Sequence, residues 1–443
     1  MSSVVTQTAA AEPTAALHPP APQTLRESGL TLDLITQLVL KHLHFAGELS
    51  GMELATRLGL GFAVVEPAIS MLKHMHSCEI ISGNIVGGAS YRYRITDAGR
   101  ERAQLMMDSN HYVGYAPVPL EQYRRYLETY RSTAPHVVTR ARVHDAYSHL
   151  VLSDRMLDQV GPAVAAGRSM FVYGPPGNGK TVIAQGIRNL LRGEIAVPHA
   201  IEVEGSIVRV FDPVNHQPIV GPAAADSLTN DSNHDARWVR CQRPMVTVGG
   251  ELNLSSLELS YSEGSGFYGA PIQMVANGGV LVIDDFGRQA CSPRELLNRW
   301  IVPLESRVDY LTLKTGQKFE LPFLVLVVFA TNVRPAELVD EAFLRRIHYK
   351  IFAENPTRED FIRIFEGVCS QQQIGFEPLL VQGLLDHYFL PRGIPLRGCQ
   401  PRDLIEQALA RAAYLEVPRQ LTFELLEAAC ASYFVDEDAQ LAA

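Results

Sequence analysis

Cysteine pairs, long apolar runs and a leader pattern are all missing from this sequence. The six cysteines in 443 residues include no C-x-x-C pair, which excludes the spacing of a zinc site and of a disulfide scaffold. No apolar stretch approaches the roughly 20 residues that span a bilayer. Residues 1–5 lack the cationic start of a signal peptide. These absences predict a cytoplasmic protein that does not bind a membrane.

An excess of positive charge is missing as well. The 39 Lys and Arg residues face 48 Asp and Glu residues, and the formal net charge is −9. This balance argues against a protein that binds a polyanion over its whole surface, while a local basic patch stays compatible with it. A chain of 443 residues is too long for one small core, and we expect about two to four domains.

The N-terminal third changes character along its length. Residues 1–25 are rich in Ala, Pro and Thr, which predicts a disordered tail. Residues 26–107 show three segments of helical periodicity followed by a short hairpin. Residues 108–145 predict a linker, in which residues 117–119 break the structure and a solvated polar helix covers residues 121–131.

A phosphate-binding loop is the most specific motif of the chain. Residues 174–181 read Gly-Pro-Pro-Gly-Asn-Gly-Lys-Thr and fit G-x-x-x-x-G-K-[ST], between a β-prone run and a helical segment. Such a loop points backbone N–H groups at phosphate oxygens, next to a helix N-terminus. We expect Lys180 to reach the β- and γ-phosphates and Thr181 to ligate Mg²⁺. The predicted nucleotide-binding residues are Gly174, Pro175, Pro176, Gly177, Asn178, Gly179, Lys180, Thr181 and Val182.

Acidic and polar groups follow two further apolar strands. The run at residues 279–287 ends in Asp284 and Asp285, and the run at residues 323–332 ends in Asn332. Ligands of open α/β sheets bind at the carboxyl ends of the strands. We therefore expect Asp284 to hold Mg²⁺ and Asp285 to orient a water molecule or act as a base.

Other segments support an α/β core. Alternating residues predict hairpins at 200–211 and 310–320 and a strand at 244–248, and residues 150–152 are candidates for an adenine pocket. Near residue 345 the adjacent Arg345 and Arg346 have two open interpretations: surface ion-pair partners, or cations that act on the γ-phosphate of a neighbouring subunit.

Together, GPPGNGKT, VLVIDDFG, FATN and DEAFLRRI resemble the ordered motifs of an AAA+ ATPase. The resemblance implies a three-layer αβα P-loop core over residues 146–353 and a helical lid over residues 354–443. It also implies ATP and Mg²⁺ as cofactors and a homo-oligomer, with a hexameric ring as the default. From the lid it implies that Arg402 faces the phosphates, with Arg397 and Arg392 as weaker candidates.

Two details refine this resemblance. The phrase at residues 265–271 and the hairpin turn at Thr315-Gly316 are similar to the branch with a pre-sensor-1 hairpin, which includes MoxR-like ATPases. Most active members carry Asp-Glu where this chain has Asp284-Asp285. Because Asp285 is one methylene shorter, we expect slow, switch-like hydrolysis.

The segment 26–107 resembles a winged helix-turn-helix domain, chiefly in the phrase at residues 93–100. Its eight basic and eight acidic residues cancel, and phosphate neutralisation supplies most non-specific DNA affinity. Docking of a protein and binding of DNA therefore both stay open. For DNA, the presumed contacts are Lys73, His74 and His76 on a recognition helix and Arg92 and Arg94 on a wing.

Three functions compete on this evidence. The first is an oligomeric ATPase that remodels an unknown client protein or a protein–DNA assembly. The second is an ATP-switched DNA-binding regulator or loader with slow hydrolysis. The third is an adaptor whose ATP site serves assembly only.

Overall fold

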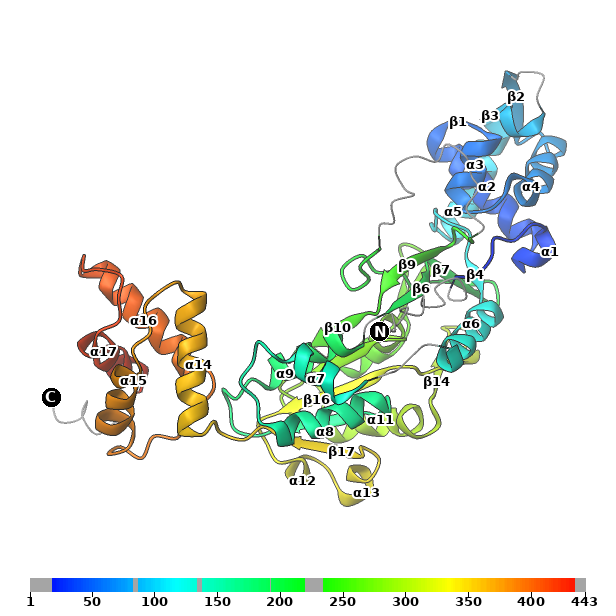
Figure 1. Cartoon of the computed structure of the whole chain (residues 1–443). Helices are drawn as coiled ribbons and strands as arrows, with labels where there is room; N and C mark the ends of the chain where they lie inside the picture. The colour runs from blue at the N-terminus through cyan, green and yellow to red at the C-terminus, as the bar shows by residue number, and fades with distance from the viewer. Residues whose placement is uncertain (1–17, 83–86, 134–137, 192, 220–233, 435–443) are drawn as a thin grey trace, which may run out of the picture.

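The computed structural model describes residues 18–82, 87–133, 138–191, 193–219 and 234–434. Figure 1 shows three bodies: an N-terminal body at the upper right, a central sheet body and a C-terminal helical body at the left. The central body carries the phosphate loop, and so the position of the other two bodies relative to it decides which of their residues reach that loop.

The main sheet of the central body is parallel throughout. Its order is β10-β13-β16-β5-β17, and every neighbouring pair is parallel. The strand before the phosphate loop, β5, thus lies beside β16, and β13 lies one position further. The bounds are β5 Met170–Tyr173, β10 Met245–Val248, β13 Val280–Ile283, β16 Leu326–Thr331 and β17 Tyr349–Phe352.

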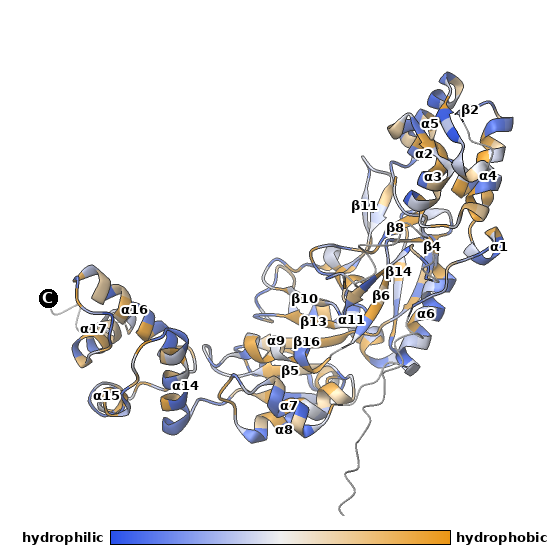
Figure 2. Cartoon of the chain, turned by 45° about the horizontal axis from the view of Figure 1, so that its top comes forward, coloured by the Kyte–Doolittle hydropathy of each residue, from blue (hydrophilic) through white to orange (hydrophobic). Residues whose placement is uncertain are grey.

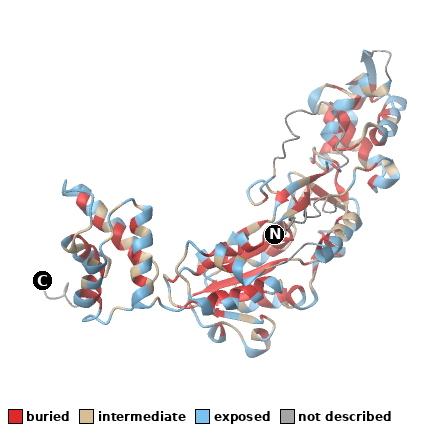
Figure 3. Cartoon of the chain, in the orientation of Figure 1, coloured by how far each residue is buried: buried red, intermediate tan, exposed pale blue. Residues whose placement is uncertain are grey.

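Both faces of this sheet are buried under helices. Alternate side chains of each strand enter two different cores: Met170 and Val172 pack towards α7, α8 and α9, while Phe171 packs towards α11. Figure 3 shows the buried residues running through the sheet between its covering helices, and Figure 2 shows the strands as the apolar layer. The predicted α/β class with a three-layer P-loop core is therefore confirmed. The helices are α7 Arg140–Ala146, α8 Asp154–Ala165, α9 Lys180–Leu190 and α11 Pro293–Ser306.

A second sheet, of order β11-β12-β8-β7-β4, lies between the main sheet and the N-terminal body. The hairpins predicted at residues 200–211 and 310–320 are both present, as is the strand predicted at residues 244–248. The bounds are β4 Val118–Pro119, β6 Glu194–Pro198, β7 Ala200–Val203, β8 Ser206–Arg209, β9 Trp238–Gln242, β11 Ser260–Ser262, β12 Phe267–Gly269, β14 Val308–Thr312 and β15 Lys318–Pro322. Short helices complete the body: α10 Ile272–Val275, α12 Pro335–Leu338 and α13 Glu341–Leu344.

Two expectations for residues 108–145 differ from the structure. Residues 117–119 do not simply break the chain, because β4 pairs with β7 at the edge of the second sheet, where a proline is tolerated. Helix α6, Leu120–Thr133, is not solvated all round: Tyr123, Leu127 and Tyr130 are buried against the second sheet. Their spacing of three and four residues places them on one face of the helix.

The N-terminal body combines helices with the three-stranded antiparallel sheet β1-β3-β2. Part of the expected tail, residues 1–17, lies outside the described residues, whereas Pro20 bridges to His234. Among the described residues no single helix is long and apolar enough to cross a membrane. Helices α3 and α4 meet that test only together, across a bend of 116°, and both pack into the N-terminal core. The bounds are α1 Leu25–Ser28, α2 Leu32–Ala46, β1 Glu48–Ser50, α3 Gly51–Leu58, α4 Phe62–His74, β2 Cys78–Ser82, β3 Arg92–Ile95 and α5 Asp97–Ser109.

The C-terminal body is helical and has its own core, in which Phe361, Phe365 and Leu404 are fully buried. A π-helical turn at Leu385–Phe389 follows α15. The helices are α14 Arg358–Gln371, α15 Pro378–Leu384, α16 Gln400–Tyr414 and α17 Phe423–Tyr433.

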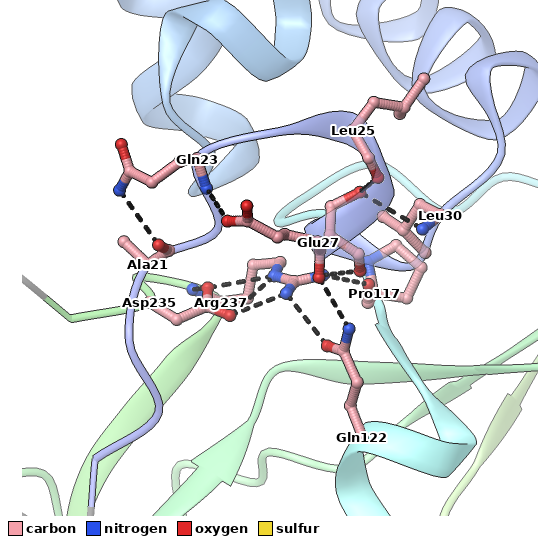
Figure 4. Close-up of polar contacts among 10 residues, drawn as sticks. Ala21, Gln23, Leu25, Glu27, Leu30, Pro117, Gln122, Asp235 and Arg237 are labelled. Atoms are coloured by element: carbon pink, nitrogen blue, oxygen red, sulfur yellow. Dashed lines mark hydrogen bonds and ion pairs between the residues drawn. The ribbon is translucent and has the colours of Figure 1, made fainter.

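A buried ion pair joins the N-terminal body to the central one (Figure 4). Arg237, 1% exposed, holds Asp235, 5% exposed, with a 2.7 Å contact from Nη2 to Oδ2. The same guanidinium donates from Nη1 to the carbonyl oxygens of Ser28 at 3.1 Å and Pro117 at 3.3 Å. It also donates to Gln122 Oε1 at 3.3 Å. One side chain, directly before β9, therefore ties together α1, the residue before β4, and α6.

Candidate functional site

The phosphate loop runs from the end of β5 to the N-terminus of α9. Gly174, Gly177 and Gly179 have φ values of 147°, 82° and 71°, in the region that favours glycine. A Cβ atom on Gly174 would lie 2.5 Å from the carbonyl oxygen of Ala353, and one on Gly177 would lie 2.5 Å from Cys399 Sγ. Two of the motif's glycines are therefore required by close neighbours as well as by backbone conformation.

Lys180 is buried at the start of α9. Its Nζ donates to the carbonyl oxygens of Gly174 at 3.1 Å and Pro175 at 2.8 Å, so the ammonium lies inside its own loop. Burial lowers the pKa of Lys180, and the nearby carboxylates of Asp285 and Asp284 act in the opposite direction. The ammonium is thus placed to neutralise an anion held by the loop.

Thr181 and Asp284 meet where α9 begins and β13 ends. The Thr181 hydroxyl donates to Asp284 Oδ2 at 2.8 Å. Hydroxyl and carboxylate oxygens are hard ligands of the kind that Mg²⁺ takes, one or two from the protein and the rest from phosphates and water. The two side chains are of the ligand type that the predicted magnesium site requires, and the site itself stays a prediction.

Asp285 and Asn332 form a second pair beside the first. Asn332 Nδ2 donates to Asp285 Oδ1 at 3.0 Å. Asp285 has a φ of 47°, a left-handed conformation that Asp tolerates better than most residues. Gln289 Nε2 donates to the carbonyl oxygens of Asp284 at 2.9 Å and Asp285 at 3.2 Å. This turn directs the two adjacent carboxylates to different partners.

One cavity of about 500 Å³ is lined by Lys180, Thr181, Asp284, Asp285 and Asn332. Its volume is within the size range of small-ligand sites. The predicted adenine segment, residues 150–152, lies on its wall, and so does Val182. The C-terminal body supplies the opposite wall. The lining residues from that body are Arg363, Ile364, Gly367, Val368, Gln371, Gly398, Cys399 and Arg402.

The phosphate loop is hydrogen-bonded directly to the C-terminal body. Asn178 Nδ2 donates to Asn355 Oδ1 at 2.8 Å, and the backbone N–H of Gly398 donates to Asn178 Oδ1 at 3.3 Å. The backbone N–H of Cys399 donates to the carbonyl oxygen of Gly177 at 2.8 Å. No motif in the sequence signals Asn355, Gly398 or Cys399, because contacts between residues so far apart in the chain leave no local pattern.

Of the three arginines predicted from the lid, Arg402 lines the cavity. Its Nη2 pairs with Asp403 Oδ1 at 3.0 Å, and its side chain is 63% exposed. Arg397 bonds to the Asn355 side chain next to the loop. Arg392 instead lies over the ring of Tyr388, 4.0 Å from the ring centroid.

The paired arginines differ from each other. Neither Arg345 nor Arg346 lines the cavity. Arg346 Nε donates to Glu305 Oε1 at 2.6 Å, in an ion pair within the same chain. Arg345 is exposed, and its guanidinium has no hydrogen bond or ion pair to another residue of the described chain.

The basic groups predicted on the wing are partly neutralised. Arg92 and Arg94 both pair with Glu48, at 3.1 Å and 3.3 Å. Lys73 and His74, at the end of α4, are exposed. The wing cations therefore have a carboxylate partner that the sequence pattern does not indicate.

Comparisons with known proteins add little beyond the fold. A family model described as a domain of unknown function (DUF8689) matches residues 357–432, within the C-terminal body. No curated protein matches the chain.

Several solved structures resemble the chain weakly. A mutant of RuvB from Thermotoga maritima is 14% identical, with 67% of this chain and 70% of that chain covered and a TM-score of 0.35. NtrX from Brucella abortus is 15% identical, with 71% and 60% covered and a TM-score of 0.40. NtrX in complex with ATP is 14% identical, with 72% and 62% covered and a TM-score of 0.38. The likeness is too weak to place this chain in either family.

Proposed function

We propose that the protein binds MgATP and hydrolyses it as an AAA+-type ATPase at the interfaces of a homo-oligomer, and so remodels a client assembly. One observation carries this proposal: Lys180, the Thr181–Asp284 pair and the Asp285–Asn332 pair converge on one cavity of about 500 Å³. A phosphate loop and an acid-bearing strand in the same parallel sheet form the arrangement that phosphoryl transfer needs.

We assign the roles of the site residues with support from the geometry. Thr181 and Asp284 would hold Mg²⁺, which would supply positive charge to neutralise the phosphate groups. Lys180 would exchange its two carbonyl acceptors for phosphate oxygens. Asp285 would orient the attacking water, with Asn332 fixing its carboxylate. Because the side chain of Asp285 is short, we expect the rate of ATP hydrolysis to be low.

Arg345 is our choice for the cation that acts on the neighbouring subunit's nucleotide. Arg346 already has Glu305 as its partner, and Arg345 is exposed. Arg402 would approach the phosphates from the lid in the same chain as Lys180. Each site would then be built from two copies of the chain.

A mixing experiment tests this assignment. Lys180→Ala and Arg345→Ala should each abolish ATP hydrolysis, the first by removing nucleotide binding and the second with ATP affinity intact. Mixed in equal amounts, the two variants should recover roughly a quarter of the wild-type rate, because random assembly pairs an intact loop with an intact arginine at that fraction of interfaces.

The matched control is Arg346→Ala, which removes a structural ion pair. By itself it should hydrolyse ATP at close to the wild-type rate, since Arg346 pairs with Glu305 within its own chain. An Arg346→Ala variant that is inactive alone and recovers activity with Lys180→Ala, beside an Arg345→Ala variant that is active alone, would reverse the assignment. Failure of every mixture, with intact ATP binding, would exclude a shared site.

For the N-terminal body we propose a winged-helix-like module that docks a protein. The pairing of Arg92 and Arg94 with Glu48 and the exposed apolar Ile80 and Ile81 on β2 support this choice over DNA. Binding of duplex DNA by the full chain at low salt, with a steep fall as salt rises, would favour the alternative of an ATP-switched DNA-binding regulator.

A further inference from the structure

A second cavity, of about 450 Å³, lies between the N-terminal and central bodies, away from the phosphate loop. Helix α2 forms one wall, and the turns of the β7–β8 and β14–β15 hairpins form others. Strands β11 and β12 and the C-terminal end of α5 form the rest. Figure 2 shows β8 and β11 on the side of the central body that is nearest to the N-terminal body. None of the groups assigned to the nucleotide lines this cavity.

Lys41 of α2 lines this cavity and is only 2% exposed. Its Nζ donates to the carbonyl oxygen of Asn110, which satisfies one of the three N–H donors of an ammonium. Within the described residues Lys41 has no ion-pair partner. Burial lowers the pKa of Lys41 to about 8, with no carboxylate acting against the shift.

The other lysine of the cavity, Lys314, already has a carboxylate partner. Its Nζ pairs with Glu263 Oε1 at 3.0 Å and lies 4.8 Å from the ring centroid of Tyr261. Removing an ammonium from water costs several kcal/mol unless a counter-ion and further hydrogen bonds compensate. Among the described residues that line the cavity there is no Asp or Glu, so the buried charge of Lys41 has no anion to balance it.

The remaining walls suit a ligand with an apolar or flat part. Tyr261 and Tyr268 lie with ring centroids 4.8 Å apart, and Leu34 and Leu38 face them from α2. Ser206 adds a hydroxyl beside them. Small-ligand sites combine such apolar walls with a few polar groups that fix orientation.

We propose that this cavity binds a small organic anion whose carboxylate or phosphate group pairs with Lys41 and whose apolar part lies against Tyr261 and Tyr268. The proposal does not depend on the nucleotide site. Because the walls come from α2 on one side and from the β14–β15 turn on the other, the bound anion would link the N-terminal body to the ATPase body. Because of this position between the two bodies, the cavity would serve as an effector site.

Calorimetry and thermal unfolding of the full chain test the proposal with three probes. Benzoate carries a flat body and a carboxylate, benzamide is its neutral counterpart, and inorganic phosphate is the anion without an apolar part. Benzoate or phosphate should bind and raise the unfolding temperature, and benzamide should bind at least about tenfold more weakly than benzoate, a difference of about 1.4 kcal/mol.

Lys41→Met should abolish this binding and should itself raise the unfolding temperature without any ligand, since it removes an uncompensated buried charge. Lys41→Gln, which keeps a donor for the Asn110 carbonyl, serves if the Met variant does not fold. The matched control is Lys318→Met on β15, an exposed lysine outside the cavity, which should bind as the wild type does.

Inorganic phosphate can also bind at the phosphate loop around Lys180. Phosphate binding that survives Lys180→Ala and is lost in Lys41→Met supports the new site, and binding with the opposite pattern counts against it. Equal affinity for benzamide and benzoate, equal shifts in Lys41→Met and the wild type, or no binding by any charged probe would overturn the proposal.

Discussion

Replacing Arg237 by methionine should loosen the junction between the N-terminal and central bodies. The change leaves Asp235, 5% exposed, buried without its cation. It also removes the donors that serve the Ser28 and Pro117 carbonyls and the Gln122 amide oxygen. Breaking a buried ion pair by removing one partner costs about 3–5 kcal/mol. Because the partners lie in α1, just before β4, and in α6, the loss falls on the junction.

Hydrogen exchange measured by mass spectrometry reports such local opening. Peptides covering residues 20–31 and 234–242 should exchange roughly 150- to 5000-fold faster in Arg237→Met, since each 1.36 kcal/mol is a factor of about ten. Adding Asp235→Asn should restore part of the protection, because no buried charge is then left unpaired.

Arg240→Met, on the adjacent strand β9, is the control. Arg240 pairs with Glu194 at 2.5 Å, but its side chain is 43% exposed, and such surface pairs contribute about 0–1 kcal/mol. Equal exchange in Arg237→Met and Arg240→Met would refute the reasoning that the buried pair holds the junction.

Three further predictions concern the site and the pH dependence. Gly177→Ala places a Cβ 2.5 Å from Cys399 Sγ at a φ of 82°, and strain of about 1–3 kcal/mol should weaken ATP binding about tenfold or more by calorimetry; unchanged affinity would contradict the close approach. Asn332→Ala removes the donor to Asp285, so kcat should fall about 100-fold with ATP affinity retained; an equal loss of affinity would assign Asn332 to binding. Burial lowers the pKa of His199 from 6.5 to about 4, so the unfolded chain binds more protons between these values and stability falls as the pH drops through that window. His199→Phe should reduce this slope in thermal unfolding, and an unchanged slope would show that other groups cause it.

Local sequence patterns were sufficient to predict the strands and helices of the α/β core. Strand, loop and helix around residues 170–190 follow from an apolar run, glycines with positive φ and a helical repeat, all within one short segment. The hairpin around Glu204-Gly205 and the one around Gly316 are equally local, since turn and alternation specify them together.

Burial was harder to predict than periodicity. Helix α6 carries many polar residues, and the burial of Tyr123 and Tyr130 depends on strands that lie far downstream in the chain. The charge of Arg92 and Arg94 is offset by Glu48, which lies on another strand of the same sheet. A composition count cannot detect either contact, because the partners are brought together only by the sheet.

The chemical groups that this protein offers could all be read from its residues: a phosphate loop, two adjacent carboxylates, an asparagine at a strand end and two neighbouring arginines. How they pair became visible only in the folded chain. There Asp284 contacts Thr181, Asp285 contacts Asn332, and the loop is tied to the C-terminal body. Folding also leaves Lys41 buried beside a cavity without a counter-ion. The spacing of residues along the chain specifies the type of each element and which of its faces is buried. Whether a hydrogen bond forms between two distant elements depends instead on their separation to within a few tenths of an ångström, and only the folded structure determines that separation.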